Sequence, residues 1–241
     1  RAFSDCIGIE SVIIPNTVIS VGEYAFSGCS ALKTVDTGDG VSIIGEGAFA
    51  YCTSLEKVAI SDYVETLEYF TFAECASLDQ IVLGRGVKSV SDGAFYGVEG
   101  LRFVFYRGSW DGFDEIDVGS SYNIAFITAT VYYEIDEDAL IEDGIYTYSI
   151  DSRGANIYVC DRVAAGVIEV PSTLGGYEVA VISRGAFRDC TGITRVTLPD
   201  TITTIAVDSF NGCSSLEEIN IPKNAVSIAT GVFRNCASLQ V

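Results

Sequence analysis

The residues of this chain that are most able to do chemistry are its eight cysteines, because the chain contains no histidine. Without histidine, the Ser-His-Asp and Cys-His arrangements that activate a nucleophile are excluded, and the chain has no CxxC pair of the kind that binds zinc. Cys160 stands outside the regular pattern described below, and Asp161 beside it disfavours the reactive thiolate, although Arg162 is also near. We therefore expect no catalytic residue, no cofactor and no metal site.

Two groups of carboxylates could in principle hold a calcium ion or act as the acid and base of a glycosidase. They are Asp111, Asp114, Glu115 and Asp117, and then Glu134, Asp136, Glu137 and Asp138. Neither group matches the spacing of an EF-hand loop, and the first lies on a predicted helix whose opposite face is apolar. We expect solvated carboxylates, and we keep a calcium site and glycosidase chemistry as alternatives.

Three residue types recur with a period of 23 residues and indicate the elements that position everything else. The aromatic column is Phe3, Phe26, Phe49, Phe72, Phe95, Phe187, Phe210 and Phe233. The thiol column is Cys6, Cys29, Cys52, Cys75, Cys190, Cys213 and Cys236. The aliphatic column is Ile9, Leu32, Leu55, Leu78, Leu101, Ile193, Leu216 and Leu239. A period in this range is typical of a solenoid, in which each unit buries its apolar side by stacking on the next.

Residues 41–60 illustrate one coil of this solenoid. Leu55, Val58 and Ile60 have the spacing of a short strand with alternate side chains facing inward, and such strands stacked in register form a parallel sheet. Apolar residues at intervals of three after Phe49 favour a short helical or 3₁₀ turn on the opposite wall. The sequence thus predicts an α/β solenoid whose coils each contain one strand, one loop, one helical turn and one return loop.

The position of the cysteines in one column indicates a packing role, because a buried thiol behaves as a small apolar group. Column members in neighbouring coils would lie one strand spacing apart, roughly 5 Å. That separation allows a disulfide by distance, but stacked parallel side chains rarely point at each other as a disulfide requires. We expect free, buried thiols.

The segments IPNTVISVGEYAFSGCSAL (14–32) and LPDTITTIAVDSFNGCSSL (198–216) share one pattern, IP-xx-V/I-xx-I-G-xx-AF-xx-C-xx-L. In this pattern the chain resembles the BspA-like leucine-rich repeats (LRR_5 type) of bacterial cell-surface proteins. The pattern loosens where other residues replace the proline or the cysteine, namely at Gly38, Ser61, Gly84, Val98 and Arg107. The resemblance implies a right-handed leucine-rich repeat coil and, for some members, attachment to host matrix proteins or to other cells.

Three regions follow from the repeat pattern along the chain. They are a first array over residues 1–106, an irregular central segment over 107–178, and a second array over 179–241. Phe95 and Phe187 are 92 residues apart, which is four periods, so we expect one continuous solenoid with an irregular centre. The alternative is two short arrays that meet at an angle near Asp136–Gly144.

The central segment contains two further signals. Trp110, Phe113 and Ile116 predict a short amphipathic helix within an enlarged coil, ending near Gly119. The β-rich runs at 146–150 and 155–159 surround a four-residue turn that ends in glycine, which predicts a hairpin.

The formal net charge of −19 argues against nucleic acid as a partner, because phosphate binding needs clustered Lys and Arg. It also disfavours anionic membrane surfaces and keeps an elongated molecule soluble and monomeric. No apolar run approaches the roughly 18 residues of a membrane-spanning helix, so we expect no membrane insertion in this segment. Arg1 lies just before a repeat phenylalanine and the array stops within a repeat at Val241, so we expect a piece of a longer protein with no signal peptide.

The outward positions of the strands stack into rows along the predicted sheet. One row runs through Ile13, Asp36, Ala59, Val82 and Phe105, and the row beside it through Ser11, Thr34, Lys57, Gln80 and Phe103. Val82, Phe103 and Phe105 thus form an apolar patch on a face that solenoids use for recognition, and we expect them as candidate ligand-binding residues. Because residues 107–133 follow directly, we expect more strongly that they cover both rings.

These observations favour a non-catalytic, extracellular or cell-surface scaffold that binds proteins or mediates adhesion. The resemblance implies host extracellular-matrix or cell-surface proteins as its partners. A structural spacer that presents another domain is the alternative function, with carbohydrate binding as a further one. We expect the chain to be a monomer.

Overall fold

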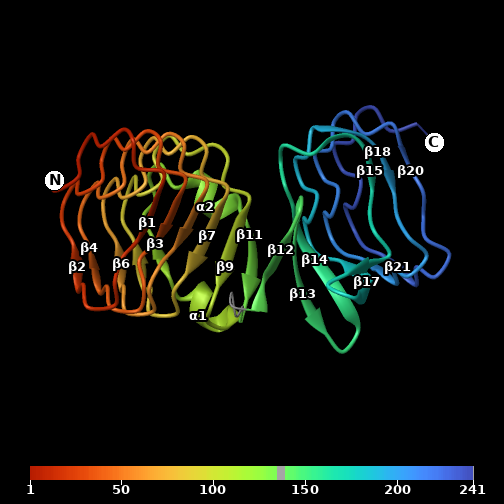
Figure 1. Ribbon diagram of the computed structural model, residues 1–241, viewed down its shortest axis with the longest axis horizontal. Helices are drawn as coiled ribbons and strands as arrows, with labels where there is room; N and C mark the ends of the chain where they lie inside the picture. The colour runs from red at the N-terminus through yellow and green to blue at the C-terminus, as the bar shows by residue number, and fades with distance from the viewer. Residues whose placement is uncertain (135–138, 241) are drawn as a thin grey trace. The chain divides into compact units, whose positions relative to one another are not determined.

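The computed structural model describes residues 1–134 and 139–240, and it divides into two compact units, Arg1–Glu137 and Asp138–Val241. Each unit is a stack of coils, which Figure 1 colours in order along the chain. A solenoid built of parallel strands, as the repeat pattern predicts, is therefore confirmed. Asp136, Glu137 and Asp138 of the second acidic group lie outside the described residues.

The first sheet of unit 1 contains one strand from every coil. Its strands follow one another in the order β1 (Ser11–Ile13), β3 (Thr34–Asp36), β5 (Lys57–Ala59), β7 (Gln80–Leu83), β9 (Phe103–Tyr106) and β11 (Thr130–Tyr133). All pairs are parallel, and across the regular coils each residue faces the residue 23 positions later, as Ile13 faces Asp36. The alignment of the predicted rows across these strands is thereby confirmed.

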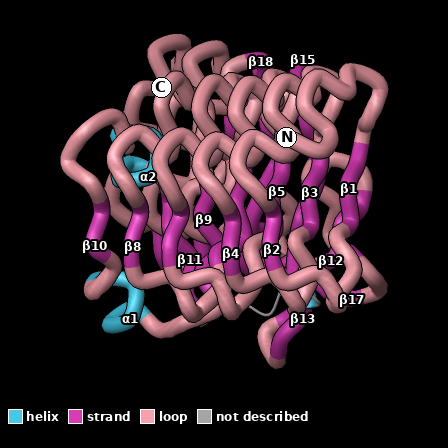
Figure 2. The backbone as a smooth tube through the Cα atoms, turned by 90° about the vertical axis from the view of Figure 1, so that its left-hand side faces the viewer, coloured by secondary structure: helices cyan, strands magenta, loops and turns pink. Residues whose placement is uncertain are grey.

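A second short strand in each coil was not predicted. These strands are β2 (Ser20–Val21), β4 (Ile43–Ile44), β6 (Thr66–Leu67), β8 (Ser89–Val90) and β10 (Asp117–Val118). They form parallel pairs in two small sheets, β2-β4 and β6-β8-β10, and in Figure 2 they succeed one another across one side of the coils. Each has one inward residue, such as Val21 or Leu67, and a run of two residues is too short to show the alternation of a strand.

The wall of each coil around the repeat phenylalanine is made of turns, so the predicted helical or 3₁₀ segment there is not confirmed. Backbone hydrogen bonds from the N–H of residue i+3 to the carbonyl of residue i do occur, as from the Cys29 N–H to the Phe26 carbonyl at 3.2 Å. Two left-handed residues surround each phenylalanine, such as Tyr24 with φ 51° and Gly28 with φ 76°, and a left-handed residue ends a right-handed helix. Figure 2 draws α1 (Trp110–Asp114) and α2 (Ile124–Thr128) as helices and the described segments around the repeat phenylalanines of the regular coils as loops.

The two left-handed positions lie two residues before and two residues after the phenylalanine in every regular coil. The positions before it are Tyr24, Gly47, Phe70, Gly93, Gly185, Asp208 and Gly231. The positions after it are Asp5, Gly28, Tyr51, Glu74, Gly97, Asp189, Gly212 and Asn235. We call the segment between and around these positions the turn wall.

The three columns that the sequence predicts line the core of unit 1, together with inward residues of the strands such as Val35 and Ile44. Successive phenylalanine rings from Phe3 to Phe95 stack at centroid distances of 5.0, 5.5, 5.8 and 5.5 Å. Phe126 on α2 continues the same stack, 5.1 Å from Phe95. Each column cysteine is a free thiol, as predicted, and the regular ones donate to a carbonyl one coil earlier, as from Cys52 Sγ to the Phe26 oxygen at 3.2 Å.

The two helices lie in the last coil of unit 1. Ser109 is the N-cap of α1 (Trp110–Asp114), and its hydroxyl accepts the Gly112 N–H. α2 (Ile124–Thr128) follows. The helix predicted here from Trp110 is present but ends sooner than expected, because residues 117–118 join the sheet as β10. No helix among the described residues is long and apolar enough to cross a membrane.

Unit 2 begins with an antiparallel meander and continues as parallel coils. Its strands are β12 (Ile141–Asp143), β13 (Tyr146–Asp151), β14 (Gly154–Cys160), β15 (Ala165–Glu169), β16 (Thr173–Leu174), β17 (Tyr177–Ile182), β18 (Gly192–Thr197), β19 (Thr204–Ile205), β20 (Glu218–Ile219) and β21 (Ser227–Ile228). β13 and β14 form the hairpin that the sequence predicts, and β14 then pairs in parallel with β17. The sheets run β12-β13-β14-β17-β19-β21 and β15-β18-β20.

Candidate functional site

The three residues predicted to bind a ligand lie on the first sheet of unit 1. Val82 is half-buried, and Phe103 and Phe105 are buried at 0% and 1% exposure. The Tyr132 ring stacks on both, with centroids at 6.2 Å from Phe103 and 5.3 Å from Phe105. Tyr132 belongs to residues 107–133, the segment expected to cover the rings of Phe103 and Phe105. A ligand at these residues stays a prediction, and it could reach the two rings only if the packing around them opened.

The first acidic group is exposed on and just after α1. Its members are Asp111, Asp114, Glu115 and Asp117. Among the described residues, no three Asp, Glu, Cys or His side chains are grouped so that they could hold a metal ion.

The turn wall of unit 1 has an unusual charge composition. The segments 22–32, 45–55, 68–78, 91–101 and 119–129 contain no lysine or arginine, and their acidic residues are Glu23, Glu46, Glu68, Glu74, Asp92 and Glu99. The matching segments of unit 2 carry Arg184, Arg188 and Arg234. A surface with one sign of charge attracts partners of the opposite sign.

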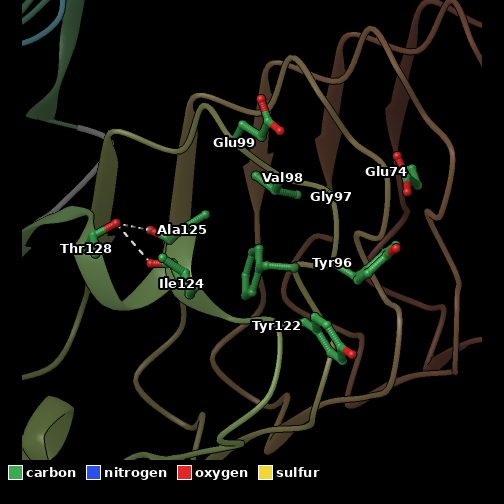
Figure 3. A pocket seen from close by; sticks show the side chains of 10 residues that line it. Glu74, Tyr96, Gly97, Val98, Glu99, Tyr122, Ile124, Ala125 and Thr128 are labelled. Atoms are coloured by element: carbon green, nitrogen blue, oxygen red, sulfur yellow. Dashed lines mark hydrogen bonds between the residues drawn. The ribbon is translucent and has the colours of Figure 1, made fainter.

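A depression of about 560 Å³ lies on this acidic wall, where the last regular coil meets α2. Its floor is apolar, because Phe95 and Val98 are buried at 1% and 6% exposure. Its rim, drawn in Figure 3, carries two aromatic rings and two carboxylates, from Tyr96, Tyr122, Glu74 and Glu99. We call these four residues, with the floor below them, the aromatic pocket.

The tyrosine rings of the aromatic pocket are open to solvent and held in a fixed arrangement. Tyr96 is 42% exposed and Tyr122 is 65% exposed. Their centroids lie 5.3 Å apart at an interplanar angle of 79°, and Phe70 meets Tyr96 on its other side at 6.4 Å and 89°. Edge-to-face packing of this kind is favourable, and it leaves ring faces available to a ligand.

The carboxylates of the pocket have no cationic partner in the described part of the chain. Neither Glu74 nor Glu99 forms an ion pair there. Glu74 is held close to Gly97, because a Cβ on Gly97 would lie 2.7 Å from the carboxyl carbon of Glu74. Glycine at position 97 therefore makes room for this carboxylate, and the backbone there is left-handed with φ 71°.

A buried asparagine connects the two walls of the pocket. The Asn123 side chain is 1% exposed, accepts the Phe95 N–H at 3.2 Å, and donates to the carbonyls of Ser91 and Gly119 at 3.0 and 3.1 Å. Next to it, the Asp92 carboxylate accepts the Ser121 N–H at 3.0 Å. These bonds fix the loop that carries Tyr122 against the coil that carries Tyr96, so the pocket is formed before any ligand binds.

Sequence reasoning missed this pocket, although the sequence contains a signal for it. The position after the repeat phenylalanine holds a small residue in the first four coils, and Tyr96 departs from that rule. Val98 departs from the cysteine column in the same coil. Tyr96 and Val98 thus both depart from the repeat pattern within three residues. They mark the last regular coil, beside which the pocket lies.

The fold and the repeat together define a leucine-rich repeat protein. Residues 1–116 and 170–241 match the family model described as BspA type Leucine rich repeat region, with six copies, and the chain belongs to this family. The matched residues include the coil of Tyr96 but not Tyr122. No protein of curated function matches the chain.

Several solved structures are similar to the chain at low identity. A leucine rich cell surface protein from Faecalibacterium prausnitzii is 23% identical, with a TM-score of 0.45, over 96% of this chain and 66% of that one. A leucine-rich repeat protein from T. pallidum is 23% identical with a TM-score of 0.37, over 96% and 78%. The pneumococcal vaccine antigen PcpA is 16% identical with a TM-score of 0.42, over 96% and 55%. The chain spans about two thirds of the first and just over half of the third.

Proposed function

We propose that this chain is a non-catalytic scaffold at a bacterial cell surface, and that it binds a partner protein through the turn wall of unit 1. The observation that carries the proposal is the aromatic pocket, in which Tyr96 and Tyr122 are exposed beside two carboxylates without a cationic partner. Exposed aromatic rings around a concave site are enriched at protein-binding surfaces, because they supply large contact areas at small entropic cost.

The surface location is supported by the family, and by the solved structure that is described as a leucine rich cell surface protein. Membership of a repeat family and the lack of histidine both favour a scaffold over an enzyme. We propose extracellular-matrix or cell-surface proteins of a host as the partner class.

A structural spacer is the competing function, and the aromatic pocket counts against it. A spacer needs coils that are soluble and stiff, and it has no need for three aromatic rings packed together on its surface. The exposed rings Phe70, Tyr96 and Tyr122 are an arrangement of that kind.

The test is binding of the chain to a panel of purified extracellular-matrix and cell-surface proteins, measured by surface plasmon resonance. The variant is Tyr96→Ala/Tyr122→Ala. The matched control is Tyr63→Ala/Tyr177→Ala, which removes two tyrosines that are 65% and 52% exposed and lie outside the pocket. We expect a saturable partner whose affinity falls at least about tenfold in the pocket variant and stays the same in the control.

Two results would contradict the proposal. If no protein of the panel binds the wild-type chain, the spacer is favoured. If a partner binds the pocket variant as tightly as the wild type, another surface carries recognition. The variant Phe103→Ala/Phe105→Ala is a poor substitute in this test, because loss of two buried rings would lower stability as well.

A further inference from the structure

The aromatic pocket has the chemistry of a site for a positively charged side chain. A cation is attracted to the face of an aromatic ring, and most strongly where it is partly removed from water. The pocket combines two exposed tyrosine rings with the carboxylates of Glu74 and Glu99 above an apolar floor. Figure 3 shows the side chains of Tyr96 and Tyr122 beside one another, with Glu74 and Glu99 at the rim.

The chain itself contains an example of this recognition on the same wall. The guanidinium of Arg1 lies over the Tyr24 ring, 4.9 Å from its centroid. The Tyr24 hydroxyl in turn donates to the Glu46 carboxylate at 2.6 Å. Arg1, Tyr24 and Glu46 thus form one cation–ring–carboxylate group at the turn wall. The aromatic pocket contains the same kinds of ring and carboxylate, but no cation among the described residues that line it.

The charge of the surroundings favours the same ligand. The turn segments 22–32, 45–55, 68–78, 91–101 and 119–129 hold six acidic residues and no basic one, and Arg1 of the first coil lies over Tyr24 instead. The polar group of Thr128 at the pocket edge is already engaged, because its hydroxyl donates to the Ile124 carbonyl at 2.9 Å. Beside the tyrosine hydroxyls, the pocket presents ring faces and carboxylates to a ligand, and both of these prefer a cation.

We propose that the aromatic pocket binds a lysine or arginine side chain of a basic segment in the partner protein, an inference that rests on the proposed function. The alkyl part of such a side chain packs over Val98 and Phe95, and the charged head lies between the tyrosine rings and the two glutamates. The partner's basic residue is the anchor of the interface, and the acidic turn wall attracts the segment that carries it.

The test is isothermal titration calorimetry with a short lysine-rich peptide and with its Nε-acetylated counterpart, which keeps the size and loses the charge. The variants are Glu74→Gln and Tyr96→Leu. The matched control is Glu23→Gln, which changes the net charge by the same amount on the same wall but outside the pocket. Thermal melting of each variant establishes that it is folded.

We expect one saturable site for the charged peptide, at least about fivefold weaker binding in both pocket variants, unchanged binding in the control, and no binding of the acetylated peptide. Equal weakening in Glu23→Gln and Glu74→Gln would overturn the proposal, because it would indicate general attraction to an acidic surface. Equal binding of the acetylated peptide, or binding of a neutral oligosaccharide in its place, would overturn it as well.

The two experiments distinguish failure of the cation site from failure of the protein-binding function. If a protein partner depends on Tyr96 but the charged peptide does not bind, the cation site is wrong and the protein-binding function stands. If the peptide binds and Glu74→Gln weakens it while the panel gives no partner, the site chemistry is right and the partner class is wrong.

Discussion

The guanidinium of Arg102 forms two hydrogen bonds to the carboxylate of Asp79, the residue at the equivalent position one coil earlier. The Nε–Oδ1 and NH2–Oδ2 distances are 2.6 and 2.8 Å. The arginine side chain is 1% exposed and the aspartate 15%, and the guanidinium also lies 4.9 Å from the Phe103 ring centroid. A bidentate pair in this environment connects the two coils, and removal of one partner leaves the other charge buried.

We expect Arg102→Met to lower the free energy of unfolding by about 3 kcal/mol, because Asp79 would keep a largely buried charge. Urea denaturation measures the change. In the double variant Arg102→Met/Asp79→Leu most of the loss should be recovered, because no unpaired charge remains. A double variant that is as unstable as the single one would contradict this account.

The position of a phenylalanine along the stack should decide the cost of removing it. Phe72 is 0% exposed and stacks on both neighbours, at 5.8 and 5.5 Å, so Phe72→Ala should cost about 3–5 kcal/mol. Phe3 is 48% exposed and has one stacked neighbour, so Phe3→Ala should cost about 1 kcal/mol or less. Thermal and urea unfolding of the two variants compare them directly, and equal losses would be inconsistent with a shared core.

The left-handed positions of the turn wall should not accept alanine. Gly212 has φ 80°, and a Cβ there would meet the Asp189 carboxylate of the preceding coil. Gly212→Ala should therefore destabilise unit 2 by about 1–2 kcal/mol. Gly22→Ala is the control, since a Cβ at Gly22 meets no heavy atom within 4 Å. We expect a lower urea midpoint for Gly212→Ala than for Gly22→Ala. Equal midpoints for the two variants would contradict this prediction.

The buried thiols should make the fold sensitive to alkali. Burial raises the pKa of Cys52 from 9.0 to about 12, although the hydrogen bond to the coil before it acts in the opposite direction. The native state then holds this proton more tightly than the unfolded state, so the contribution to stability is present below pH 9 and is lost as the pH rises towards 12.

Cys52→Ala isolates this contribution, because the variant cannot titrate at that position. We expect the wild type to exceed the variant in free energy of unfolding at pH 8, and the difference to shrink steadily above pH 9. Denaturation by urea at several pH values gives the comparison. A difference that stays constant up to pH 11 would show that the Cys52 thiol titrates alike in the folded and unfolded states, so that burial does not raise its pKa.

The sequence predicts the stacked coils because the same side chains meet themselves one coil later. Phe26 stacks on Phe49, 23 residues later, at a centroid distance of 5.5 Å, as the period requires. The turn wall could not be predicted in the same way. Its apolar spacing is also that of a helix, and left-handed backbone at Tyr24 or Tyr51 leaves no mark in the sequence, because these residues rarely adopt it.

The aromatic pocket escaped prediction for a related reason. It depends on where Tyr122 is placed, and the loop of Tyr122 is positioned by Asn123 and Asp92 through hydrogen bonds between coils. A repeat pattern predicts the residues that obey the period, whereas this site is built by residues that break it. Phe103 and Phe105 also break the pattern of their rows, and burial of both rings depends on packing that the strand alternation does not report.

Phe95 and Phe126 are stacked as neighbours although 31 residues separate them, where 23 separate the others. The phenylalanine stack continues across the lengthened coil, whose extra residues place Trp110 and Tyr122 on the surface and add Phe113 and Ile116 to the core. An array of this design can therefore vary its outer face by lengthening a single coil, at little expense to folding. The residues that form the exposed surface are then different from the residues that form the core, and either group can change without the other.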